Sequence, residues 1–177
     1  MFVAIKLIDR LTNPRLFLIL IVLYGIVFGT ILFTLGQLTE TSGGYGILDF
    51  DRGYDMARVR DVFGSYGPDG MRLYGRIQFL DVFNPGLYSL VAAVFTRLLW
   101  RGRGPNWMCL VPLLGGLGDY AENFTLFLMA RSYPELSAGL VSTSSMLSLI
   151  KNGLMIVGLL PLLVGIILLM VRFVRRA

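Results

Sequence analysis

Four ionisable side chains lie inside apolar stretches of this sequence and are its strongest candidates for chemistry. Asp81 lies in the stretch Y-G-R-I-Q-F-L-D-V-F-N-P. Asp119 and Glu122 lie in G-G-L-G-D-Y-A-E-N, and Lys151 lies in S-L-I-K-N-G-L. A charged group at membrane depth costs about 3 kcal/mol even on the gentlest scales, so such groups usually face other helices and have a function.

Polar residues recur around these charges at helical spacing. Steps of three and four residues define one helical stripe, which consists of Tyr74, Gln78, Asp81, Asn84 and Tyr88. Further along the chain, residues 119 and 122 are three apart and share a helix face. At about 1.5 Å per residue, residues 81 and 122 lie at one level, and the side chain at 151 reaches down from one or two turns above.

The sequence therefore predicts a polar, carboxylate-lined pocket in the outer half of a helical bundle. Three carboxylates in a medium of low dielectric constant cannot all stay ionised without partners, so at least one is expected to hold a proton. A proton-binding site and a general acid both need such a group. The candidate ligand-binding residues are Gln78, Asp81, Asn84, Asp119, Tyr120, Glu122, Asn123, Lys151 and Asn152.

Three functions are compatible with this pattern. The first is a membrane receptor or carrier for a small or amphipathic ligand, lipid-like or sterol-like, whose cationic group would suit the excess of carboxylates. The second is an enzyme of the isomerase or cyclase type acting on a lipid or isoprenoid. There, Asp119 or Glu122 would be the catalytic proton donor and Asp81 its catalytic partner, with Tyr120 or Lys151 assisting. The third is a structural or assembly subunit in which these charges form an ion-pair network.

The composition indicates a polytopic membrane protein. Of the 177 residues, 55% are hydrophobic and only 15% charged, where soluble proteins have about 25% charged residues. The mean hydropathy is +0.71. The sequence has no histidine and a single cysteine, Cys109, which excludes an internal disulfide and an ordinary zinc site. No metal and no cofactor are expected, because no phosphate-binding loop or haem motif is present.

Four stretches are long and apolar enough to cross a bilayer as helices. We expect one membrane domain over residues 1–177, an all-α antiparallel four-helix bundle with spans at about 16–38, 76–100, 107–130 and 144–171. The first span is expected to be retained, since no small-residue cleavage pattern follows it. Basic residues gather before span one, between spans two and three, and after span four, so both termini are expected in the cytoplasm. For a bacterial chain this means the inner membrane.

Two glycine and proline features bear on the spans. Pro85 is expected to kink the second span just past Asp81. Gly115, Gly116 and Gly118 precede Asp119. These glycines would either open space for a ligand or permit close helix packing.

The segment of residues 39–75 is expected outside the cytoplasm and contains a short amphipathic helix over 54–63, stopped by Gly64 and the turn at 67–70. This helix would rest on the bundle or cover a pocket as a lid. The acids of D-F-D-R-G-Y-D, residues 49–55, suggest calcium, but this stretch lacks the glycine and glutamate of an EF-hand loop.

Taken alone, Lys151 would be an interfacial lysine whose ammonium group extends to water.

The predicted architecture is similar to that of the four-span sterol-binding and sterol-isomerising proteins of the EXPERA type. The similarity lies in the topology, in the short length and in an acid early in span two, here Asp81. It implies a ligand pocket within the membrane, but the histidine of the isomerase members is missing. Expected partners are membrane lipid and a small or amphipathic ligand, without nucleic acid. A complete transporter would need a homodimer, because four spans are few for one.

Overall fold

The computed structural model describes residues 2–175, and within them every regular element is helical. The first elements are α1 (Phe2–Leu11), α2 (Pro14–Thr41), the short 3-10 helix η1 (Leu48–Phe50) and α3 (Met56–Leu80). They are followed by α4 (Asn84–Trp100), the 3-10 helix η2 (Asn106–Leu110), α5 (Pro112–Ser132) and α6 (Ala138–Val174). The predicted all-α class is thereby confirmed.

Among the described residues, three helical segments are long and apolar enough to cross a membrane. They are Pro14–Thr41, Met56–Trp100 and Ala138–Val174. The helix α5 is not among them, since its 21 residues include Asp119, Glu122 and Arg131. The chain therefore has the helices of a membrane protein, with one charged helix packed between the apolar ones.

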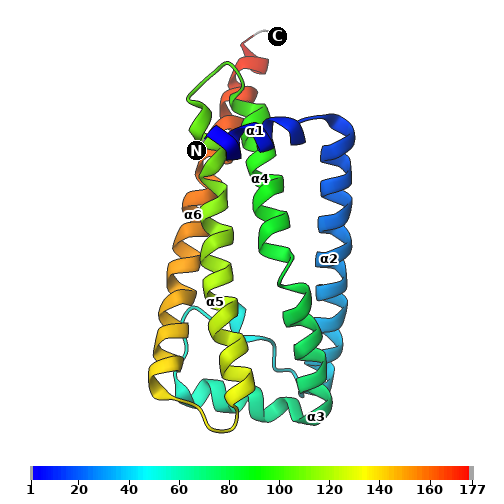
Figure 1. The fold of residues 1–177 in the computed structure, drawn as a ribbon, viewed down its shortest axis with the longest axis vertical. Coiled ribbons are helices and arrows are strands. Elements are labelled where there is room, and N and C mark those ends of the chain that lie inside the picture. Colours follow the sequence, from blue (N-terminus) through cyan, green and yellow to red (C-terminus); the bar gives the residue numbers. More distant parts are fainter. Residues whose placement is uncertain (1, 176–177) are drawn as a thin grey trace.

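The long helices lie alongside one another in an up-and-down arrangement (Figure 1). The helix α1 lies across one end of the bundle, near the end of α6. The first part of α3 lies across the opposite end, before α3 turns upward toward α4 (Figure 1). Both ends of the described chain are therefore at the same end of the bundle.

The second predicted span is two helices rather than one kinked helix. α3 ends at Leu80, residues 81–83 form turns, and α4 begins at Asn84 with Pro85 in its first turn. Proline lacks a backbone N–H group and fits the first turn of a helix, where that group would have no partner. The chain therefore starts a new helix at this proline, which leaves Asp81 at a break between helices.

The predicted amphipathic helix is present but longer than expected. It begins at Met56, where the side chain of Asp55 accepts a hydrogen bond from the Arg58 backbone, and it passes through Gly64. The backbone leaves helical geometry only at Gly67, whose φ of 56° suits a residue without a Cβ. Its buried face includes Val59, and Phe63 packs within an aromatic group that Tyr66, Tyr74 and Tyr133 complete. This helix closes one end of the bundle.

Candidate functional site

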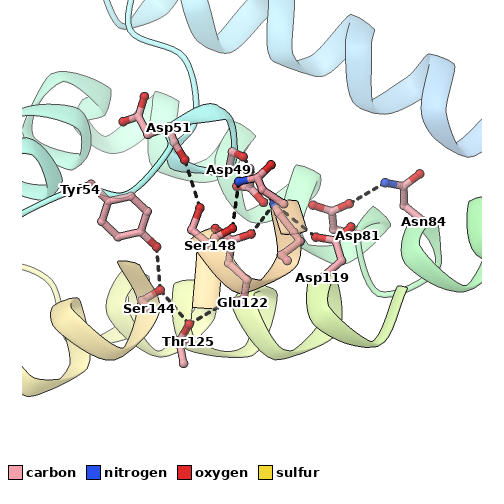
Figure 2. A network of polar contacts seen from close by, with 12 residues as sticks. Asp49, Asp51, Tyr54, Asp81, Asn84, Asp119, Glu122, Thr125, Ser144 and Ser148 are labelled. Carbon is pink, nitrogen blue, oxygen red and sulfur yellow. Dashed lines mark hydrogen bonds and ion pairs between the residues drawn. The ribbon is translucent and has the colours of Figure 1, made fainter. Parts of the chain in front are cut away.

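The cluster of charges inside the bundle is centred on Lys151 of α6. Its ammonium group forms an ion pair with Glu122 of α5, and it lies 3.5 Å from Oδ1 of Asp119, also on α5 (Figure 2). Lys151 is 5% exposed and Glu122 is fully buried. The interpretation of Lys151 as an interfacial lysine is therefore wrong, because two carboxylates on the neighbouring helix hold its ammonium group inside the bundle.

The loop before α3 brings a further carboxylate to this cluster. The backbone carbonyl of Asp49, in η1, accepts a hydrogen bond from Nζ of Lys151 at 3.4 Å. One carboxylate oxygen each of Asp49, Asp119 and Glu122 lie within 4.8 Å of one another. Sequence reasoning did not place Asp49 in the site, because no helical periodicity links a loop residue to a helix about 70 residues further along.

Polar contacts hold this loop in place on α6. The hydroxyl of Ser148 donates to the carbonyl of Asp51 at 3.0 Å, and the backbone N–H of Tyr54 donates to Oγ of Ser145 at 2.9 Å. The hydroxyls of Tyr54 and Ser144 lie 2.7 Å apart (Figure 2). Ser144, Ser145 and Ser148 of α6 therefore bind the loop.

The three acids of residues 49–55 have separate partners. Asp51 accepts two hydrogen bonds from the Arg58 guanidinium, at 2.7 and 3.3 Å, and Asp55 caps α3. Only Asp49 reaches the buried cluster. A calcium loop needs its acids to converge on one point, which these residues do not do.

Hydroxyl and amide groups bind two of the remaining carboxylates. Tyr88 of α4 donates to Oδ2 of Asp119 at 3.1 Å, and the amide of Asn84 donates to Oδ1 of Asp81 at 3.1 Å. The hydroxyl of Tyr120 donates to the carbonyl of Val82 at 3.0 Å and accepts from the Gly86 N–H at 3.2 Å. The Tyr120 hydroxyl therefore joins α5 to the break between α3 and α4.

Several buried polar atoms of the site have no hydrogen-bond partner among the described residues. Neither oxygen of Glu122 meets a donor with hydrogen-bond geometry, although Oε2 is ion-paired with Lys151. Oδ1 of Asn84 and Nδ2 of Asn123 are also without partners. Leaving a buried polar group unpaired costs about 1–3 kcal/mol. These atoms are therefore free to form hydrogen bonds with a ligand or a proton.

Burial beside other carboxylates changes the pKa values of the loop residues. Burial raises the pKa of Asp49 from 3.8 to about 8; Lys151 opposes this rise, and the carboxylates of Asp81, Glu122 and Asp119 add to it. Burial likewise raises the pKa of Tyr54. Burial therefore favours the protonated form of Asp49 near neutral pH.

A cavity of about 480 Å³ lies between α3 and α5, beside the charge cluster. Asp49, Tyr74, Gln78, Asp81, Tyr120 and Asn123 form the polar part of its lining, and Gly75, Ile77, Phe79, Val82, Phe124 and Phe127 complete it. Four of the apolar lining residues are between 42% and 66% exposed, whereas the two carboxylates are partly buried. The cavity thus has an apolar mouth and carboxylates set deeper.

The predicted site residues divide into two groups. Gln78, Asp81, Tyr120 and Asn123 line the cavity. The remaining predicted residues, Asn84, Asp119, Glu122, Lys151 and Asn152, are not part of its lining. Asn152 instead donates to the Ser148 carbonyl one turn earlier on α6, at 2.8 Å. The cavity and the ion-pair cluster are therefore neighbours, joined through Asp49.

The glycines before Asp119 serve close helix packing. A Cβ at Gly116 would lie 2.7 Å from Oγ of Ser89 and 2.8 Å from the carbonyl of Pro85, both on α4. A Cβ at Gly118 would lie 3.1 Å from the Cα atom of Lys151 on α6. Small residues let the backbones of membrane helices approach closely. These glycines therefore bring α5 against both neighbours, which places its carboxylates beside Lys151.

The converging oxygens of Asp49, Asp119 and Glu122 are close enough to share one cation, and the ammonium of Lys151 already contacts Glu122 and approaches Asp119. We therefore assign no metal to these residues.

Compared with known protein families, with curated proteins and with solved structures, the chain gives no match.

Proposed function

We propose that this chain is a four-span membrane protein that binds a small or amphipathic ligand bearing a cationic group in the cavity between α3 and α5. The supporting observation is the composition of that cavity. Asp49 and Asp81 line it with two carboxylates, while Phe79, Phe124 and Phe127 supply exposed aromatic surface. Pockets of about 300–1,000 Å³ with apolar walls and a few convergent polar groups are typical ligand sites.

The fourth span in this proposal is α5. Its 21 residues extend about 30 Å as a helix, which matches the hydrocarbon core of a bilayer. Its two acids are turned toward α4 and α6, since Asp119 is 8% exposed and Glu122 is fully buried. A helix whose charges are hidden from lipid can cross a membrane despite a modest hydropathy.

The ion-pair network has a different part in the proposal. Lys151, Glu122 and Asp119 hold α5 against α6, as the structural hypothesis expects, and do not line the cavity. The enzyme hypothesis has less support, because its proposed proton donors are separated from the space that a substrate would occupy. Asp49 and Asp81 remain as the acids available to a ligand.

Binding of tetraphenylphosphonium, a hydrophobic cation, to the purified protein tests the proposal. Tetraphenylborate has nearly the same shape and the opposite charge, and we expect it to bind at least tenfold more weakly. Replacing Asp81 by Asn should weaken the binding of the cation about tenfold, equivalent to about 1.4 kcal/mol. The matched control is Asp61→Asn on the exposed face of α3, which should bind as the wild type does. Equal binding of both probes would contradict the proposal.

A further inference from the structure

The charges of the cluster do not balance. Four carboxylates lie together, Asp49 on the loop, Asp81 at the break after α3, and Asp119 and Glu122 on α5, and the other three each act electrostatically on Asp49. Within residues 2–175 the cation that faces them is Lys151 on α6. If all four acids were ionised, the buried cluster would carry three uncompensated negative charges, which a medium of low dielectric constant strongly disfavours.

The other basic side chains near this level face elsewhere. Arg58 is bound to Asp51 in a paired hydrogen-bond arrangement. Arg72 and Arg76 line a separate groove between α2 and α3. The neutral groups that face the cluster are hydroxyls, from Tyr54 in the loop, Tyr74 on α3 and Tyr88 on α4. When no ligand is bound, protons on some of these carboxylates must therefore neutralise the excess negative charge.

Glu122 is the most deeply buried of the four acids. It is fully buried, and Oε1 has neither a hydrogen-bond donor nor an ion pair among the described residues. Lys151 is the cation that pairs with this carboxylate, through Oε2. Any further positive charge that enters the neighbourhood will therefore change how many protons the group of acids retains.

Asp49 couples the cavity to this cluster. Its side chain lines the cavity, and one of its carboxylate oxygens lies within 4.8 Å of oxygens of Asp119 and Glu122. A positive charge placed in the cavity beside Asp49 stabilises the ionised form of this acid and of the acids behind it. The coupling needs no conformational change, because the two sites share a residue.

We infer that binding of a cationic ligand in the cavity releases a proton from the carboxylate cluster, with Asp49 as the group that loses it. The inference rests on the proposed function and adds that the bound species exchanges with protons. By linkage, protons and the ligand cation must then weaken each other's binding equally. Such an exchange is the thermodynamic basis on which a proton gradient can drive uptake or release of a cation.

The test measures tetraphenylphosphonium binding to the detergent-solubilised full chain at pH 6, 7 and 8. If one proton leaves for each cation bound, the affinity rises tenfold per pH unit. The slope should become shallower between pH 7 and 8 and level off above pH 8, because the pKa of Asp49 is about 8 and half of this acid is already ionised at that pH. A pH-sensitive dye in weakly buffered solution should record the released proton directly. We expect Asp49→Asn to bind with little pH dependence, and Asp61→Asn to keep the wild-type slope.

The outcomes separate the exchange from the binding itself. If the wild type binds the cation with an affinity independent of pH and releases no proton, the exchange is overturned and the proposed function stands. If Asp49→Asn binds with the full wild-type slope, the exchange at Asp49 is overturned. If the wild type binds no cation at any pH, both proposals fail. The wild-type slope and the dye signal need no variant, so a variant that does not fold leaves the test decisive.

Discussion

At the scale of single residues, Lys151 is the side chain on which the arrangement of the site depends most. It contacts both acids of α5 and a carbonyl of the η1 loop, so it joins three parts of the chain at one buried point. A buried ion pair adds little stability compared with apolar residues of the same volume, but removing one of its partners leaves an uncompensated charge. The consequences of losing Lys151 and of losing the whole pair should therefore differ.

Replacing Lys151 by Met should lower the free energy of unfolding by about 3–5 kcal/mol, because Glu122 is left buried without its cation. The double variant Lys151→Met/Glu122→Gln should recover part of this loss, since it removes the unpaired charge as well. Unfolding by sodium dodecyl sulfate in mixed micelles, followed by circular dichroism, measures both changes. Lys6→Met on the exposed side of α1 is the matched control. Equal stability of the two single variants would show that the ion pair does not stabilise the fold.

At the scale of elements, α5 is the helix that builds the site, and its glycines determine how closely it approaches α4 and α6. Gly116 packs against the first two turns of α4, where Pro85 and Ser89 leave no room for a Cβ. The same contact positions the break that carries Asp81. Close packing and the placement of the acids are therefore properties of one helix interface.

Replacing Gly116 by Ala should destabilise the protein by about 1–3 kcal/mol, because the added methyl group meets the Pro85 carbonyl as well as a side chain. The control is Gly153→Ala on α6, where a Cβ meets nothing within 4 Å. There the better helix propensity of alanine should leave stability unchanged or slightly higher. Thermal unfolding of both variants in one detergent measures the difference. If both variants melt at the same temperature, α4 and α5 are not packed as described.

The elements also show what could be predicted from the sequence. Hydropathy predicted the apolar helices, and the period of the helix placed Asp119 and Glu122 on one face, because these features depend on residues near in sequence. Counting 1.5 Å per residue placed Lys151 one or two turns above them, with its side chain within reach. The break after Asp81 was expected only as a kink, since a proline near a helix start and one inside a helix look alike in sequence. The position of Asp49 depends on where a loop folds back, which local patterns do not encode. The cavity was missed as a separate space for the same reason.

At the scale of the whole molecule, the distribution of basic residues predicts how the bundle is oriented. α1, the connection between α4 and α5, and the end of α6 lie at one end of the bundle (Figure 1). Arg97 ties this end together through Asp9 of α1 at 2.6 Å and Asn106 of η2 at 2.7 Å. Because positively charged loops stay in the cytoplasm, this end is expected there, with the α3 end outside.

Single cysteines test both this orientation and the crossing of α5. Cys109 is the chain's one cysteine and is buried, so Cys109→Ala provides a background without reactive thiols. In that background, Arg103→Cys and Glu135→Cys place exposed thiols before and after α5. We expect a membrane-impermeant maleimide to label position 135 in intact cells, and position 103 only after the cells are broken. Because the two positions flank one helix, equal labelling in intact cells would mean that α5 does not cross the membrane, and reversed labelling would place the basic end outside.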